Sequence, residues 1–175
     1  MSDEVIKNEA LDENSGENQD KHMFMTFQCG KESFGIEIKY VEEIIQYQSI
    51  TTIPEVEDYI KGLINLRGKI IPVIDVRMRF GQEPLEYNER TCIIVINVNG
   101  VVVGLIIESI AMVVTIENDN ILPPPTLSHG PEPNKYVYGI GKTGDSVKLL
   151  LDPEKLVCNI EVDEMISTDG MEEAE

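Results

Sequence analysis

The chain has 175 residues, with 14 basic and 32 acidic side chains and a formal net charge of -18. This charge argues against direct binding to nucleic acid or to an anionic membrane, because both surfaces require cationic partners. Residues 1–22 contain seven acids and two bases, and residues 161–175 contain seven acids and no base. The body of the chain is therefore only mildly acidic.

The cysteines and histidines are too few and too scattered for a disulfide framework or a metal centre. Cys29, Cys92 and Cys158 are 63 and 66 residues apart, and the only histidines are His22 and His129. This spacing favours a reducing compartment and predicts neither a metal nor another cofactor. The N-terminus lacks an apolar secretory segment, so we expect a cytoplasmic protein.

The ends of the chain mix acids, Asn, Ser and Gly without hydrophobic periodicity. Such segments cannot bury enough apolar area to offset the entropy lost on ordering. We therefore expect disordered acidic tails over residues 1–21 and 163–175, on either side of one folded region over residues 22–162.

The first predicted elements are two strands and a short helix. Apolar residues alternate from Met23 to Cys29, a turn follows, and a second strand is expected over Phe34–Ile38. Further on, Ile38, Val41 and Ile44-Ile45 have helical spacing, with Glu42 and Glu43 on the other face.

A β-hairpin is the clearest local prediction in the second half of the chain. Cys92–Val98 and Val101–Ile107 are apolar and β-branched, and Asn99-Gly100 between them is the strongest two-residue hairpin signal in the sequence. Asp75 and Asp152 each precede a predicted turn of helix, which favours a capping role for both.

The sequence also matches itself in two collinear stretches. A shift of 69 places Phe34-Gly35-Ile36 on Val103-Gly104-Leu105, and a shift of 77 places Tyr59 on Tyr136 and Asp75 on Asp152. Two matches in the same order predict a tandem repeat, and hence an all-β chain of two small barrels over about 23–90 and 91–160.

No catalytic constellation emerges from these patterns. The string Gly139–Gly144 satisfies the GxGxxG spacing of dinucleotide-binding loops, but the residues after it continue as a strand, so a hairpin turn is favoured. A carboxylate pair formed by Asp75 and Asp152 would be the main alternative to capping. A small β-barrel ligand-binding protein or enzyme stays open as an alternative function.

The segment from Tyr59 to Asp75 is unusually apolar and is interrupted by Arg67 and Lys69. Asn65-Leu66-Arg67-Gly68 within it is typical of a turn that presents a cation beside apolar neighbours. A turn charge is often simply solvated, so a binding role competes here with a plain surface role.

Phe34–Ile45 and the run Asn-Leu-Arg-Gly-Lys-Ile-Ile-Pro-Val-Ile-Asp over residues 65–75 closely resemble the CheW family, the coupling proteins of bacterial chemotaxis. The resemblance extends from about Met23 to Val157. It implies two five-stranded Src-homology-3-like barrels that share an apolar core, no catalytic activity and no cofactor. It also implies two partners, the cytoplasmic tip of chemoreceptors and the regulatory domain of the histidine kinase CheA.

Carried over by position, the resemblance gives a set of partner-contact residues but no catalytic or metal-binding residue. For the receptor it implies Arg67, Val41, Glu43 and Leu63, and for the kinase Gly62, Ile38, Ile60 and Lys61. We therefore expect a non-enzymatic cytoplasmic adaptor that reaches the membrane only through receptor arrays.

Overall fold

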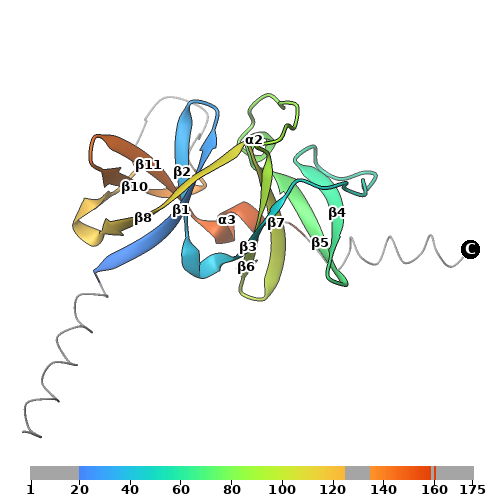
Figure 1. Ribbon diagram of the computed structural model, residues 1–175, viewed down its shortest axis with the longest axis horizontal. Helices are drawn as coiled ribbons and strands as arrows, with labels where there is room; N and C mark the ends of the chain where they lie inside the picture. Colours follow the sequence, from blue (N-terminus) through green and yellow to red (C-terminus); the bar gives the residue numbers. More distant parts are fainter. Residues whose placement is uncertain (1–19, 125–134, 159, 161–175) are drawn as a thin grey trace, which may run out of the picture.

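The computed structural model describes residues 20–124, 135–158 and 160. The chain forms two β-sheets that lie side by side, with short helical segments between and around them (Figure 1). Sheet A has the order β8-β1-β2-β11-β10-β9, and sheet B has the order β3-β6-β7-β5-β4. The mainly β architecture confirms the predicted fold class.

The strands of sheet A are β1 (Lys21–Cys29), β2 (Glu32–Glu37), β8 (Ser109–Glu117), β9 (Ile121–Leu122), β10 (Val137–Thr143) and β11 (Ser146–Leu151). Those of sheet B are β3 (Val41–Gln46), β4 (Ile60–Leu66), β5 (Lys69–Asp75), β6 (Cys92–Val98) and β7 (Val101–Ile107). The helical segments are η1 (Ile38–Tyr40), α2 (Val76–Arg79), η2 (Asn118–Asn120) and α3 (Pro153–Val157).

The internal repeat is visible in the strand register. A shift of 77 carries β4 onto β10 residue for residue, and it also carries α2 onto the start of α3. The parallel pair Val73↔Gly104 joins β5 to β7, and the repeat-related pair Leu150↔Gly35 joins β11 to β2. The two halves of the chain thus form the same local structure.

The sheets do not follow the predicted division into residues 23–90 and 91–160. Strands β1 and β2 leave their own half and pair with strands of the second half, while β6 and β7 join the first. The sheets have six and five strands in an open order, not five each in consecutive barrels. The exchange is possible because β1-β2 and β6-β7 are repeat-related, so each hairpin fits either sheet.

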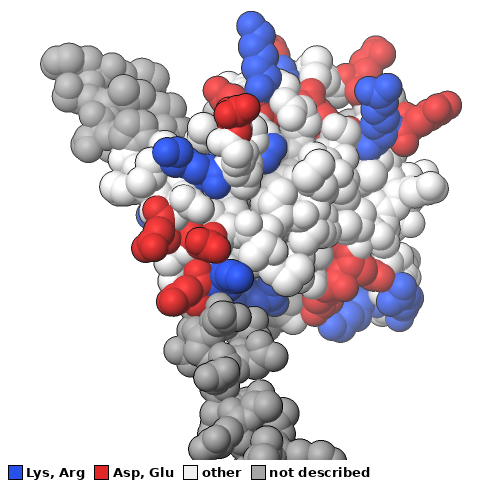
Figure 2. Space-filling view, turned by 60° about the vertical axis from the view of Figure 1, so that its left-hand side comes forward, with Lys and Arg blue, Asp and Glu red and all other residues white. Residues whose placement is uncertain are grey.

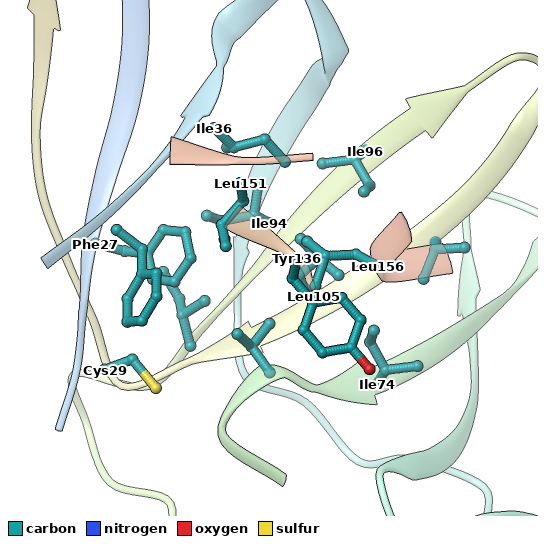
Figure 3. Packing of buried hydrophobic residues seen from close by; sticks show 14 of the residues in the cluster. Phe27, Cys29, Ile36, Ile74, Ile94, Ile96, Leu105, Tyr136, Leu151 and Leu156 are labelled. Carbon is teal, nitrogen blue, oxygen red and sulfur yellow. The ribbon is translucent and has the colours of Figure 1, made fainter. Parts of the chain in front are cut away.

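The buried apolar side chains of the described residues form three clusters. The largest lies between the sheets, includes Phe27 and Ile36 from sheet A and Ile94 and Leu105 from sheet B, and also contains Leu156 of α3 (Figure 3). Two smaller clusters each belong to a single sheet, one to sheet B and one to sheet A. The shared apolar core that the sequence predicted is therefore present.

The helix predicted from the spacing of Ile38, Val41 and Ile44-Ile45 is wrong. Only Ile38–Tyr40 is helical, and Val41–Gln46 forms strand β3, in which more and less exposed side chains alternate. Glu37 makes no side-chain capping bond to start a helix. The backbone of this segment pairs with β6 instead, and sheet pairing overrides a weak helical spacing.

Strand β1 begins at Lys21, the last residue of the expected N-terminal tail and one residue before the expected start of the folded region. The remaining parts of both expected tails, residues 1–19 and 163–175, lie outside the described residues. No helix among residues 20–124 and 135–158 is long and apolar enough to cross a membrane.

Candidate partner-binding site

Arg67 lies at the tip of the β4–β5 hairpin, as the sequence predicted. Arg67 and Gly68 have consecutive positive φ angles of 53° and 86°, the backbone conformation of a tight two-residue turn. The side-chain oxygen Oδ1 of Asn65 accepts a hydrogen bond from the Gly68 amide at 2.9 Å and fixes the turn. The hairpin therefore holds the arginine out from the sheet.

The guanidinium of Arg67 reaches across to Glu43 on strand β3. Its Nη2 lies 2.8 Å from Oε2 of Glu43, while the Arg67 side chain remains 78% exposed. Because β3 and β4 are the opposite edge strands of sheet B, this ion pair also shows that the sheet curls strongly. Two residues predicted for receptor binding are thus in direct contact at the surface.

Apolar side chains are also exposed near this ion pair, on β3, which contains Glu43, and on β5, which follows the turn that contains Arg67. Ile44 follows Glu43 on β3 and is 39% exposed, and Ile70 follows the hairpin turn on β5 and is 40% exposed. An arginine combined with exposed aliphatic residues is a common composition for the centre of a protein–protein interface.

Three of the predicted contact residues are buried on strand β4. Ile60 and Leu63 are 7% and 4% exposed, and Gly62 is buried as well. The side chains of Ile60 and Leu63 cannot contact a partner without a change in the sheet. They can affect binding only indirectly, by fixing the shape of β4.

The backbone geometry and the close packing at position 62 explain why this residue is a glycine. Its φ is 142°, and a Cβ at this position would lie 1.9 Å from the carbonyl oxygen of Thr51. Thr51 and Leu63 form a β-bridge through two backbone hydrogen bonds of 2.8 and 2.9 Å. The glycine therefore lets the segment after β3 pack directly on β4.

The other three predicted contact residues are half-buried. Val41 starts β3 and packs against the shared core, and Ile38 lies in η1, the connection between sheets A and B. Lys61 lies on β4 between two buried residues. The structure thus brings Arg67 and Glu43 together but spreads the other predicted positions over η1, β3 and β4.

A cavity of about 70 Å³ lies elsewhere, beside α2 and the segment that leads to β6. Its lining includes Cys29, Asp75 and Tyr87, and the Tyr87 hydroxyl donates a 2.7 Å hydrogen bond to Oδ2 of Asp75. Burial, with the Glu108 charge nearby, raises the pKa of the Cys29 thiol to about 12. The thiol is therefore protonated near neutral pH and is not an activated nucleophile.

The structure supports the capping role of the two aspartates over the alternative of a carboxylate pair. Asp75 and Asp152 cap α2 and α3, respectively, as the sequence favoured. No group of three or more potential metal ligands occurs in the described parts of the chain.

Sheet A also has exposed apolar residues that the sequence reasoning did not assign to a binding site. Met112, Val113 and Val147 are 61%, 45% and 53% exposed. By the shifts of 69 and 77 they correspond to Glu43, Ile44 and Ile70 of sheet B. The repeat could have revealed them, because it relates each position of the predicted site to a position on the other sheet.

Figure 2 turns the side of sheet A toward the reader and shows a broad uncharged area with acidic and basic side chains around its margin. Sheet B thus has a surface ion pair that includes Glu43, whereas the repeat-related position on sheet A has Met112. Methionine is flexible and polarizable, and it suits adaptable protein-binding surfaces.

Two repeat-related sheets with exposed apolar residues and a surface ion pair define a small protein-binding module. Comparison with known proteins gives the family. Residues 23–161 match the CheW-like domain, and the chain belongs to the CheW family. Members of this family are scaffold proteins of chemotaxis without enzymatic activity, and this holds for the present chain.

Several relatives support this assignment. The chemotaxis protein CheW of Klebsiella aerogenes is 37% identical over 143 residues, which cover 79% of this chain and 83% of the relative. CheW of Treponema pallidum is 32% identical and covers 85% and 89%, respectively. The crystal structure of the scaffolding protein TtCheW from Thermoanaerobacter tengcongensis superposes with a TM-score of 0.69 at 36% identity, covering 75% of this chain and 88% of that one.

Proposed function

We propose that this chain is a cytoplasmic adaptor that couples chemoreceptors to the histidine kinase CheA through protein–protein contacts. In this proposal it reaches the membrane only through the receptors, and it binds no nucleic acid. The observation that carries the proposal is Arg67, which a rigid turn holds 78% exposed within a CheW-family domain.

The receptor surface in this proposal is centred on Arg67 and Glu43. An arginine has five N–H donors, and among the described residues Arg67 hydrogen-bonds only to Glu43. The remaining donors can bind carboxylate or carbonyl oxygens of a receptor helix. Val41 supports β3 from the core side, and Leu63 supports β4.

The kinase surface begins at Ile38, in the connection between the sheets, and extends over the exposed apolar residues of sheet A. Lys61 is a further contact position on β4, while Ile60 and Gly62 act by shaping that strand. Because Met112 and Val113 lie on a different sheet from Arg67, the two partners can bind at once.

Reconstitution of the three components tests the proposal. Vesicles that display a receptor cytoplasmic fragment are sedimented with CheA, with and without this chain. We expect CheA to sediment with the vesicles only when the chain is present, and we expect Met112→Glu to weaken capture of the kinase. Kinase recruitment that is equal with and without the chain would refute the adaptor function.

A further inference from the structure

The guanidinium of Arg79 lies between two repeat-related tyrosines. Arg79 is the last residue of α2, and its Cζ lies 4.2 Å from the ring centre of Tyr59 and 5.2 Å from that of Tyr136. Tyr59 precedes β4 of sheet B, and Tyr136 precedes β10 of sheet A. A single cation therefore contacts equivalent aromatic rings from the two sheets.

Each of these tyrosines is fixed to the helix of its own half. The carbonyl oxygen of Tyr59 accepts a 2.8 Å hydrogen bond from the amide of Asp75, the cap of α2. In the same way, the carbonyl oxygen of Tyr136 accepts a 2.7 Å bond from the amide of Asp152, the cap of α3. Each tyrosine is therefore held in a fixed position relative to the helix of its own half and to the strand that follows it.

Arg79 also binds the end of α3 directly. Its Nε donates to the carbonyl oxygen of Leu156 at 3.3 Å, and its Nη2 donates to that of Cys158 at 2.9 Å. Carbonyl groups at the end of a helix lack partners within the helix, and a cation there is favourable. Since α3 follows β11, these bonds connect the helix after β5 to the helix after β11.

The second copy of the repeat has no arginine at the position that corresponds to Arg79. A shift of 77 carries Arg79 onto Leu156, which is fully buried in the shared core beside Tyr136 (Figure 3). The next residue, Phe80, packs in a tilted arrangement against Tyr136, at 5.6 Å, and against Phe34 of β2, at 5.0 Å between ring centres. Arg79 at the end of α2 and Phe80 directly after it thus reach across to the elements of sheet A.

From this geometry we infer that Arg79 is a positioning residue that fixes the orientation of sheet A relative to sheet B, and that coupling of two partners depends on it. The inference rests on the proposed function, in which the receptor surface is centred on sheet B and the kinase surface on sheet A, with Lys61 of β4 as an additional kinase contact. Each surface lies mainly on one sheet, so binding of a single partner depends little on the angle between the sheets, whereas simultaneous binding in one geometry needs a fixed angle.

The first test separates binding from coupling. The Arg79→Gln variant removes the charge and the guanidinium fork. We expect its affinity for each isolated partner to stay within about twofold of wild type, and kinase recruitment to receptor vesicles to fall about tenfold or more. Arg90→Gln is the matched control, because Arg90 is exposed and lies outside the sheet interface, and it should leave recruitment unchanged.

The second test measures the orientation itself by electron–electron double resonance. Spin labels are placed on sheet B and sheet A, and the native cysteines are removed. We expect one narrow distance distribution for the otherwise unchanged chain and a broader one with Arg79→Gln. The labelled chain carries Lys69→Cys, Lys142→Cys, Cys29→Ala, Cys92→Ser and Cys158→Ser.

The recruitment and distance measurements together decide between the possible roles of Arg79. An Arg79→Gln chain that keeps the narrow distribution and wild-type recruitment overturns the inference. If the wild-type chain does not recruit the kinase, the proposed function fails, and the distance distribution alone decides the role of Arg79. If Arg79→Gln does not fold, Arg79→Lys replaces it in both tests, because lysine keeps the charge but lacks the planar fork.

Discussion

Asp75 and Asp152, 77 positions apart, are the side-chain N-caps of α2 and α3. Oδ1 of Asp75 accepts from the Met78 amide at 3.2 Å, and Oδ1 of Asp152 accepts from the equivalent Lys155 amide at 3.4 Å and also from the Glu154 amide at 3.0 Å. Their surroundings differ, since Asp75 is 4% exposed and its second oxygen also accepts from the Tyr87 hydroxyl. The same cap thus occurs once in the interior and once nearer the surface.

The two caps should therefore differ in their contribution to stability. We expect Asp152→Ala to lower the free energy of unfolding by about 1 kcal/mol, the usual loss for a helix cap. Asp75→Ala should cost about 2–4 kcal/mol, because it also leaves the half-buried Tyr87 hydroxyl without its acceptor. Urea denaturation measures the free energy of unfolding of both variants. The Tyr87→Phe variant, measured in the same way, removes only the hydroxyl. Equal losses for the two aspartates would contradict this account.

Arg67→Glu should damage receptor binding more than folding. An exposed charge change shifts the free energy of unfolding by about 0.5 kcal/mol or less, whereas loss of a desolvated interface cation costs about 2–5 kcal/mol of binding. The variant should melt close to wild type and fail to bind the receptor fragment in a sedimentation assay. Unfolding of the variant would make Arg67 a structural residue instead.

Two further variants sharpen the Arg67 experiment. The double variant Glu43→Arg with Arg67→Glu can rebuild the ion pair in reverse but presents the opposite charge at the hairpin tip, so it should still fail to bind the receptor. Glu89→Lys changes an exposed charge in the segment between α2 and β6. This control variant should leave both the melting temperature and receptor binding unchanged. Receptor binding by the double variant at wild-type strength would show that only the ion pair matters.

Gly62→Ala should disrupt the contact between β4 and the segment that contains Thr51. The added Cβ would clash with the Thr51 carbonyl oxygen, and the φ of 142° is itself unfavourable for alanine. We expect a loss of about 2–4 kcal/mol in the free energy of unfolding. Gly68→Ala, at a φ of 86° with open space around it, should cost only about 1 kcal/mol. Similar melting temperatures for the two variants would contradict the clash.

The Cys29 thiol should resist alkylation in the folded protein. Its pKa is raised from 9.0 to about 12, first by burial, so almost no thiolate is present at pH 8. Iodoacetamide should modify the exposed Cys158 much faster than Cys29, as peptide mass spectrometry can show. Equal rates in the folded state would contradict the burial of Cys29.

The raised pKa of Cys29 also gives a pH dependence with a definite sign. Between pH 9 and 12 the unfolded chain loses the thiol proton while the folded chain keeps it. This group therefore makes the protein less stable as the pH rises through that range. Cys29→Ala should flatten this part of the stability curve.

Local signals in the sequence determined many elements of the fold. The strands Cys92–Val98 and Val101–Ile107 have the predicted bounds, because a β-branched run, an Asn-Gly turn and a second run leave little choice of register. The capping roles of Asp75 and Asp152 and the turn that presents Arg67 also depend on neighbouring residues only. The repeat was visible for the same reason, since both copies preserve the local pattern.

The tertiary structure alone decided which strands share a sheet. Strands β1-β2 and β6-β7 are repeat-related and similarly apolar, so the sequence does not distinguish pairing within a half from pairing across halves. The exchange, the ion pair between Arg67 and Glu43, and the contacts of Arg79 with Tyr59 and Tyr136 all join segments distant in the chain. Such contacts depend on how the two sheets pack together, which no local pattern records.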